Sequence, residues 1–339
     1  MRKINLAIVG ATGAVGEVAL TILAQRQFPI DKLYLVASKN SAGRTISFQG
    51  ETLPVVNLED FDFKKANIAI FSIGKEIATE YAPLAVASNC FVIDNSAAFR
   101  YQDEVPLIVT EVNGHLLEKT ASRIISNPNC STIQMIVAIK PIYDAVGIKT
   151  INVATYQSVS GQGREAMLEL IEQTKAVINN KAIPHQVFKK QIAFNVLPEI
   201  DQRQENGFTF EEMKMVWETQ KILADQTVLV NPTTVRVPVM VGHAMAVHIE
   251  TKQPISLTQA EQLLMSAPGV IYQPYKSEGS YPTQITEAEG NDAVFVGRLR
   301  KNLACEQGIN MWVVSDNLRK GAALNAIQIA EKLITYNRI

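Results

Sequence analysis

Cysteine is scarce in this chain, and its few thiols are poorly spaced for cross-linking. The 339 residues include 3 cysteines, an odd number, at Cys90, Cys130 and Cys305. No CxxC pair occurs, so the sequence predicts neither a disulfide framework nor a zinc site, and we expect no metal. A lone cysteine is usually a small core residue, and this interpretation suits Cys90 and Cys305.

The chain also lacks a long hydrophobic run and a strong charge of either sign. Its start, MRKINLAIVGATG, has about six apolar residues before glycines intervene, which indicates a first strand rather than a signal peptide. No stretch approaches the ~20 apolar residues that span a bilayer. The formal net charge is -1, so the composition favours neither a nucleic-acid partner nor a membrane surface. We expect a cytoplasmic protein with small-molecule substrates.

The first 130 residues alternate strands with helices. Such alternation predicts right-handed βαβ units and a parallel sheet, an α/β Rossmann-type domain. The strands are expected at 4–9, 32–38, 67–73 and 91–96, with helices ending near 25 and spanning 76–88.

The pattern changes after the helix that begins near Cys130. Segments 150–159, 227–252 and 292–301 are rich in β-formers and predict an α+β domain on a mostly antiparallel sheet. Helices are expected at 163–180, 210–223 and 258–266, and 181–209 reads as an irregular arm.

The C-terminal segment 316–339 is expected to form a helix that packs on the first domain. Asp316 and Asn317 are candidate caps. One helical stripe carries Ala323, Ile327, Ala330 and Ile334, and it needs an apolar partner. We therefore divide the chain into 1–129 with 316–339, a nucleotide-binding domain, and 130–315, a catalytic domain.

Gly10, Gly13 and Gly16 lie between a predicted strand and a predicted helix. That context is typical of a dinucleotide loop, where backbone amides receive a pyrophosphate. NAD-preferring sites usually carry an acid at the end of the second strand, whereas residues 37–44 read ASKNSAGR. Two cations and several small polar residues suit a 2′-phosphate, so we favour NADP over NAD.

Cys130 departs from the usual buried cysteine because polar residues surround it where an apolar helix begins. The helix macrodipole contributes about 0.3–1 kcal/mol to holding a thiolate. Lowering a thiol pKa from about 8.5 to near 7 takes roughly 2 kcal/mol, so another positive group or a base is needed. The helix start alone is insufficient.

Together the motifs GATGAVG, SAG, DNSAAFR, SNPNCSTIQ, YQSVSGQG, ETQK, RVPV…GH and WVVSDNL(R)KGAA resemble the aspartate-β-semialdehyde dehydrogenase family across essentially the whole chain. The resemblance implies a Rossmann domain joined to a catalytic and dimerisation domain like that of glyceraldehyde-3-phosphate dehydrogenase. It also implies a homodimer and NADPH-dependent conversion of aspartyl phosphate to aspartate semialdehyde and phosphate. This reaction feeds lysine, threonine, methionine and diaminopimelate synthesis.

The resemblance also implies roles for individual residues. Cys130 would be the nucleophile that forms a thioester, Gln157 would orient the substrate, and His243 would be the acid/base that protonates the thiohemiacetal oxygen. The implied substrate contacts are Arg236 for the carboxylate, Glu218 for the ammonium, and Arg100 and Lys221 for phosphate. Separately, the backbone amides at the helix start, together with Asn129, are candidates for stabilising the oxyanion. The implied cofactor contacts are Gly10, Thr12, Gly13, Ala14, Val15, Gly16, Ser38, Asn40, Ser41, Ser160, Gly161 and Asn317. Asn40 stands where the family usually has arginine, which weakens the grip on a 2′-phosphate unless Lys39 or Arg44 substitutes.

One pair of implied residues sets a geometric requirement. Arg236 and His243 are seven apart, so on one regular strand their side chains would face opposite sides. We therefore predict that the strand bends, bulges or ends near Gly242. The other histidines, His115, His185 and His248, fit surface or sheet positions better.

Three alternatives stay open at this point. N-acetyl-glutamyl-phosphate reductase shares the fold and the thiol chemistry, but its acetylated substrate amine carries no positive charge for Glu218 to meet. A cysteine hydrolase using Cys130 and His243 would leave the glycine loop unexplained. A non-catalytic nucleotide-binding relative would be expected to lack the nucleophile, and Cys130 is present.

Overall fold

A computed structural model describes residues 2–339, and the chain divides into two units within it. The chain up to Asn129 and the returning segment Ala322–Ile339 form the first unit, and Cys130–Gly321 form the second. Among residues 2–339, no helix combines the length and apolar character needed to cross a membrane.

The first unit is built on a seven-stranded sheet with the order β3-β4-β2-β1-β5-β6-β7. All neighbouring strands run parallel except β3 and β4. The predicted Rossmann-type domain is therefore confirmed. The elements are β1 (Ile4–Val9), α1 (Ala14–Gln25), β2 (Ile30–Ala37), β3 (Thr45–Phe48), β4 (Glu51–Asn57), β5 (Ile68–Phe71), α2 (Lys75–Ala87), β6 (Phe91–Asp94), α3 (Thr110–Asn113), β7 (Ile124–Ser126) and α8 (Leu324–Thr335).

The β3–β4 hairpin is an element that the hydrophobic pattern did not predict. Its strands are short and largely exposed, so they carry no clear apolar alternation. The turn is made by Gln49 and Gly50, both with positive φ, which matches the right-handed twist of a tight hairpin.

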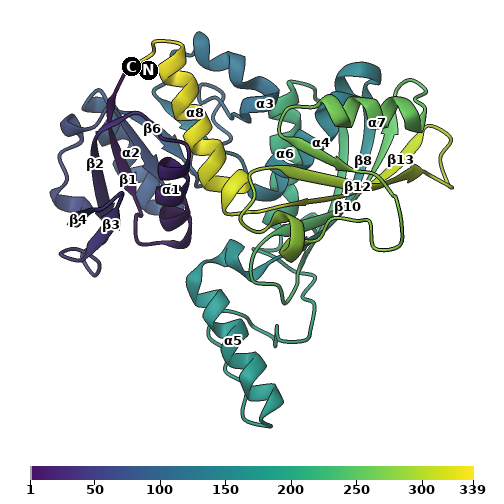
Figure 1. Ribbon diagram of the computed structural model, residues 1–339, viewed down its shortest axis with the longest axis horizontal. Helices are drawn as coiled ribbons and strands as arrows, with labels where there is room; N and C mark the ends of the chain where they lie inside the picture. The colour runs from purple at the N-terminus through teal and green to yellow at the C-terminus, as the bar shows by residue number, and fades with distance from the viewer. Residues whose placement is uncertain (1) are drawn as a thin grey trace. The chain divides into compact units, whose positions relative to one another are not determined.

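The C-terminal helix packs on the first unit, as predicted, but it is shorter than predicted. Its four stripe residues are buried in one cluster with side chains of α1 and the central strands. Figure 1 shows α8 lying beside α1. Helix α8 starts at Leu324 rather than near 316, and residues 316–321 belong to the second unit.

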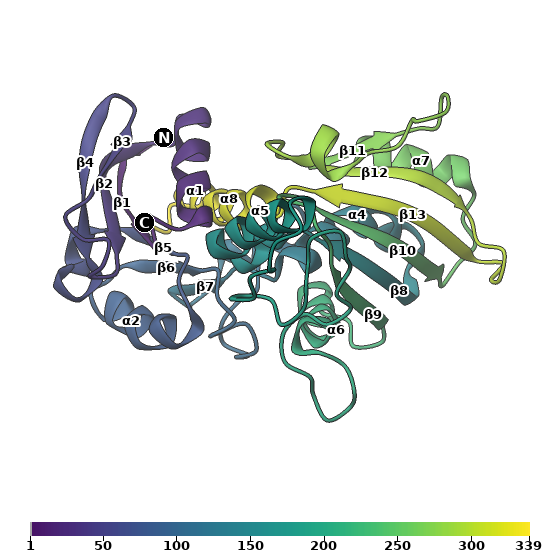
Figure 2. The ribbon, with the colours of Figure 1, turned by 90° about the horizontal axis from the view of Figure 1, so that it is seen from below.

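The second unit holds a mixed six-stranded sheet with the order β11-β12-β13-β10-β8-β9, in which three of the five strand pairs are antiparallel. Helices α4, α6 and α7 cover the sheet in one layer (Figure 2). The elements are α4 (Cys130–Val146), β8 (Ile148–Gln157), α5 (Arg164–Ile178), α6 (Phe210–Leu223), β9 (Leu229–Arg236), β10 (His243–Thr251), α7 (Leu257–Ser266), β11 (Val270–Gln273), β12 (Val294–Lys301) and β13 (Gly308–Ser315).

Helix α5 and the segment after it, 181–209, form an arm that extends from the sheet of the second unit (Figure 1). The segment has no regular helix or strand, as predicted. It is held instead by two buried polar side chains of α5. The Glu169 carboxylate accepts the amides of residues 186–188, and the Gln173 side-chain oxygen accepts the Ile192 and Ala193 amides at 2.8 and 3.2 Å.

We expect Glu169→Gln to loosen the arm while the rest of the unit stays folded. The substitution keeps the shape of the side chain but removes the charge from hydrogen bonds worth about 1.5–3 kcal/mol each. Hydrogen exchange of the amides of residues 186–188 should accelerate at least tenfold, and limited proteolysis should cut within 181–209. Glu172→Gln, at an exposed position of the same helix, is the control and should exchange like the wild type. Unchanged exchange in Glu169→Gln would contradict this role.

Candidate active site

The glycine loop in the first unit is shaped by two glycines that nothing larger can replace. Gly10 has φ of +92°, and a Cβ there would lie 2.3 Å from the Ser72 carbonyl oxygen. A Cβ on Gly16 would lie 2.3 Å from the Gly10 carbonyl oxygen, so its absence lets α1 pack against the loop. Helix α1 begins at Ala14 without a side-chain cap, which leaves its first amides directed at the loop. This arrangement fits a pyrophosphate.

The end of β2 lies beside this loop. The Thr12 hydroxyl donates to the Ser41 hydroxyl at 3.2 Å, which joins the glycine loop to the turn after β2. Ser38, Lys39 and Asn40 are exposed in that turn, and no acid occurs between residues 38 and 44. The turn therefore presents cations and small polar side chains, and no carboxylate, beside the glycine loop.

In the second unit, Cys130 is the first residue of α4, as predicted, and is partly exposed. A Cβ on Gly321 would lie 2.8 Å from the Cys130 Cβ, so only glycine allows the chain to pass this close. Cys90 offers a contrast because it is fully buried, and burial raises the pKa of its thiol to about 12. Cys90 is therefore the inert core residue that the sequence predicted. The same prediction is wrong for Cys305, which is only partly buried and lies in the loop between β12 and β13.

Three of the predicted site residues lie in one row across the sheet. Gln157 at the end of β8 pairs with Arg236 on one side and with His243 on the other. Residues directly opposite one another on neighbouring strands project from the same face. Arg236 and His243 therefore share a face despite their odd spacing. The predicted irregularity is confirmed, because β9 ends at Arg236 and β10 starts at His243, just after Gly242, whose φ is +88°.

The row is joined to Cys130 through α4. The Gln134 side chain, one turn after Cys130, donates to the His243 carbonyl oxygen at 3.2 Å. Burial lowers the pKa of Arg236, while the charges of Glu211 and Cys130 act in the opposite direction. The guanidinium of Arg236 is thus a buried cation within electrostatic reach of the thiol, the kind of group that the helix start alone did not supply.

His243 is fully buried and electrically neutral over the physiological range. Burial, followed by the nearby Arg236 charge, lowers its pKa to about 3. Its Nδ1 accepts the Ser158 backbone amide at 3.1 Å, whereas its Nε2 has no hydrogen-bond partner among the described residues. Nε2 is itself buried, and a Cβ on Gly161 would lie 3.3 Å from it, so the glycine keeps a side chain away from this edge of the ring.

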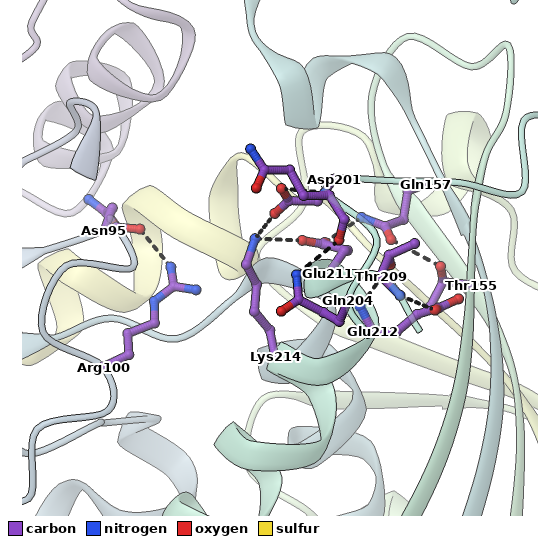
Figure 3. A network of polar contacts seen from close by, with 11 residues as sticks. Asn95, Arg100, Thr155, Gln157, Asp201, Gln204, Thr209, Glu211, Glu212 and Lys214 are labelled. Carbon is purple, nitrogen blue, oxygen red and sulfur yellow. Dashed lines mark hydrogen bonds and ion pairs between the residues drawn. The ribbon is translucent and has the colours of Figure 1, made fainter. Parts of the chain in front are cut away.

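Glu211 and Lys214, at the start of α6, lie close to Gln157 (Figure 3). The Gln157 amide donates to Glu211 Oε1 at 3.0 Å, and Lys214 Nζ lies 3.0 Å from Glu211 and 2.8 Å from Asp201. Burial pulls the pKa of Lys214 down, but Glu211 and Asp201 together outweigh this effect and raise it. Sequence reasoning missed both Glu211 and Lys214 as site residues.

The predicted pair Glu218 and Lys221 lies farther along the same helix. Glu218 is two turns beyond Glu211, about 10 Å along the axis, and is fully buried. The pairs Glu211/Lys214 and Glu218/Lys221 have the same spacing, so the sequence pattern could not choose between them. The bond from Gln157 to Glu211 identifies the pair at the ends of the strands.

Arg100 and Asn129 belong to the first unit, and both are buried there. The Arg100 guanidinium donates to the Asn95 carbonyl oxygen at 2.6 Å (Figure 3). Asn129 directly precedes Cys130 in the chain. Among residues 2–339, no group of three or more histidine, cysteine, aspartate or glutamate side chains has the arrangement of a metal site.

Family comparisons identify the class of protein. The model "Semialdehyde dehydrogenase, NAD binding domain" matches residues 5–120, and "Semialdehyde dehydrogenase, dimerisation domain" matches residues 139–320. The two models together cover most of the chain, which is therefore a semialdehyde dehydrogenase, an oxidoreductase with a domain for a nicotinamide cofactor.

Individual relatives narrow the class. The chain is 54% identical over 333 residues to an aspartate-semialdehyde dehydrogenase of Legionella pneumophila, covering 98% of this chain and 96% of the relative. It is 45% identical to that of Bacillus subtilis, covering 100% and 99%. Aspartate semialdehyde dehydrogenase II of Vibrio cholerae, solved in complex with ASA, superposes with a TM-score of 0.96 at 50% identity, covering 99% of each chain. The chain belongs to the aspartate-semialdehyde dehydrogenase family.

The buried His243 should make the folded state sensitive to acid. Its pKa is lowered from 6.5 to about 3, so between these values the unfolded chain binds a proton that the folded chain does not. We expect the free energy of unfolding to fall as the pH drops from 6.5 toward 3, and His243→Asn to remove part of that fall. Urea denaturation at pH 7 and pH 5 measures it. His115→Asn, at an exposed position, should keep the wild-type dependence. If the stability of His243→Asn depended on pH in the same way as that of the wild type, His243 would not be the source of the acid sensitivity.

Proposed function

We propose that this enzyme reversibly reduces L-aspartyl 4-phosphate to L-aspartate 4-semialdehyde and phosphate with NADPH, through a thioester on Cys130. The observation that carries the proposal is that Arg236, Gln157 and His243 share one face of the sheet, with Arg236 within electrostatic reach of the helix-start thiol of Cys130. In this proposal the first unit binds the cofactor, and the second binds the substrate and forms a homodimer.

The cofactor contacts are assigned to the glycine loop and to the turn after β2. The amides that open α1 suit the pyrophosphate, and Thr12 and Ser41 bring the two segments together. Lys39 and Arg44 offer the 2′-phosphate the cations that Asn40 does not. When bound, the reduced nicotinamide supplies the hydride. Ser160 and Gly161 are the residues assigned to contact the nicotinamide end of the cofactor.

The substrate carries a carboxylate, an ammonium and an acyl phosphate, and the residues of the site complement each. Arg236 suits the carboxylate because a guanidinium binds it through two parallel hydrogen bonds. Glu211, already bonded to Gln157, suits the ammonium. Lys214 and Arg100 suit the phosphate. We therefore transfer the roles first given to Glu218 and Lys221 to Glu211 and Lys214.

The chemistry proceeds in two stages on the sulfur of Cys130. The thiolate attacks the acyl carbon, a C–S bond forms, and the C–O bond to the departing phosphate breaks. After hydride reaches that carbon, the oxygen carries the negative charge, and the Nε2–H of His243 and the amides that open α4 can donate to it. The C–S bond then breaks, which releases the aldehyde and restores the thiolate.

A buried carboxylate also separates this proposal from its near rival. N-acetyl-glutamyl phosphate has no positive charge on its nitrogen, so an acid in contact with Gln157 would be left without a partner on that substrate. An aspartyl substrate carries an ammonium that complements the negative charge of Glu211. The glycine loop, in turn, has no role in a cysteine hydrolase.

The dimer is assigned to the second unit. The family model that matches it is described as a dimerisation domain. Apolar side chains of α5 are also exposed on the arm, which suits burial against a second copy of the chain. The exposed α5 side chains are those of Leu168, Ile171 and Ile178.

The proposal is tested by mixing the protein with aspartate semialdehyde, phosphate and NADP and following the absorbance of the reduced cofactor. Wild-type protein should reduce NADP, and NAD should serve less well. Cys130→Ala should lose activity by at least 10⁴-fold, since no other group can carry the acyl intermediate. Cys305→Ala is the matched control and should keep the wild-type rate. A Cys130→Ala protein with wild-type turnover would refute the thioester route.

The choice of acid is tested by Glu211→Gln and Glu218→Gln. Glu211→Gln removes a charged contact with the ammonium, so the KM for aspartate semialdehyde should rise about tenfold or more. Glu218→Gln should leave this KM within about threefold of the wild type. Thermal unfolding of both variants shows whether either loss reflects misfolding. A high KM confined to Glu218→Gln would restore the assignment made from the sequence.

A further inference from the structure

Asn317, expected from the resemblance to contact the cofactor, also has a set of contacts within the second unit. Its side chain is buried there among three segments. Its Oδ1 accepts the Gly242 backbone amide at 2.8 Å and lies 3.1 Å from each of the Ser158 and Ser160 hydroxyls. Its Nδ2 lies 3.0 Å from the Ser160 hydroxyl. All four contacts are to groups flanking His243.

The orientation of this amide follows from chemistry alone. A backbone N–H can only donate, so the atom that faces Gly242 must be the oxygen of Asn317. The same reasoning applies to His243, because the Ser158 amide can only donate to Nδ1. A neutral imidazole whose Nδ1 accepts a hydrogen bond carries its proton on Nε2.

Asn317 is itself held rigidly. It follows Asp316, whose carboxylate accepts the backbone amides of Leu318, Arg319 and Gly290 at 2.8, 3.1 and 2.9 Å. The same turn brings Gly321 against Cys130, and a Cβ on Gly321 would lie 3.6 Å from the Asn317 Cβ. One short turn therefore contacts the nucleophile on one side and the support of His243 on the other.

From these contacts we infer that Asn317 is a positioning residue, which acts through Ser158 to hold His243 as the imidazole that presents its Nε2–H to the site. This inference rests on the proposed function, because it specifies what His243 does there. The ring acts as a neutral donor to the substrate oxygen. Protonating Nδ1 as well would break the bond from the Ser158 amide and leave that amide buried without its acceptor.

The charged and titratable groups around His243 are consistent with a neutral ring. Arg236 of β9 opposes a positive charge on it, and Glu211 of α6 favours one. Cys130 of α4 interacts electrostatically with Arg236. Gly161 places no side chain against the Nε2 edge of the ring, where a Cβ would lie 3.3 Å from that nitrogen. These charges keep the ring neutral, and the hydrogen bonds of Asn317 and Ser158 determine which of its nitrogens carries the proton.

The direct test is the tautomer of His243 in the free enzyme, read by nitrogen-15 NMR of protein labelled at histidine. Wild-type protein at pH 7.5 should show a protonated Nε2 and an unprotonated Nδ1. In Asn317→Ala the two forms should mix, and kcat should fall about tenfold or more, while the KM for NADP changes less than threefold. Asn113→Ala, which removes another buried asparagine in the first unit, should keep the wild-type tautomer and kcat.

The link through Ser158 is tested by a double-mutant cycle. Ser158→Ala should resemble Asn317→Ala. The kcat of the double variant should be no lower than that of the less active single variant, because both changes break the same link between Asn317 and Ser158. Losses that multiply would overturn the link. A wild-type protein with its proton on Nδ1, or an Asn317→Ala protein whose only defect is a raised KM for NADP, would overturn the inference. Since the tautomer is read without substrate, a failure of the proposed reaction would be distinguishable from either result.

Discussion

The site depends on the pairing of β8 with a different partner on each side. Because Gln157 pairs with both Arg236 and His243, one row of the sheet carries a cation, an amide and an imidazole on the same face. The connection between β9 and β10 crosses the end of β8 through Gly242, whose positive φ permits the turn. If the register of either pair slipped by one residue, its side chain would turn to the opposite face of the sheet.

Burial then gives each member of this row a distinct electrostatic role. His243 stays neutral because charging it would cost desolvation beside Arg236. Arg236 stays charged, since its ordinary pKa is so high that burial cannot deprotonate it. The thiol of Cys130 thus meets the positive end of α4 and a buried cation together. The helix start alone would not suffice, and the charge of Arg236 acts on the same sulfur.

Much of this architecture was predictable because local pattern and global fold agree. The strand, glycine loop and helix at the N-terminus were predicted from Gly10 and Gly16, whose positions the close packing of the loop requires. Cys130 was placed at a helix start because it and its polar neighbours directly precede an apolar run. The stripe on α8 predicted a helix packed on the first unit, since four small or apolar residues at helical spacing must be buried together.

Other features depend on contacts that a linear pattern does not contain. Glu211 and Glu218 are equivalent by spacing, and only the position of Gln157 on a distant strand distinguishes them. Ser158 contacts His243 through its backbone amide and Asn317 through its hydroxyl, and neither contact can be read from the linear sequence. Asn317 was recognised as important, but its partners lie far away in the sequence, and its expected role followed from resemblance rather than geometry.

The most direct measurement of the central claim is the site of covalent capture. Without phosphate, a mixture of the enzyme, aspartate semialdehyde and NADP should form an aspartyl thioester that has no acceptor for release. Peptide mass spectrometry of the quenched enzyme should find the aspartyl group on the peptide that contains Cys130, together with one reduced cofactor per adduct. An adduct on Cys90 or Cys305, or cofactor reduction with no adduct at all, would contradict the account.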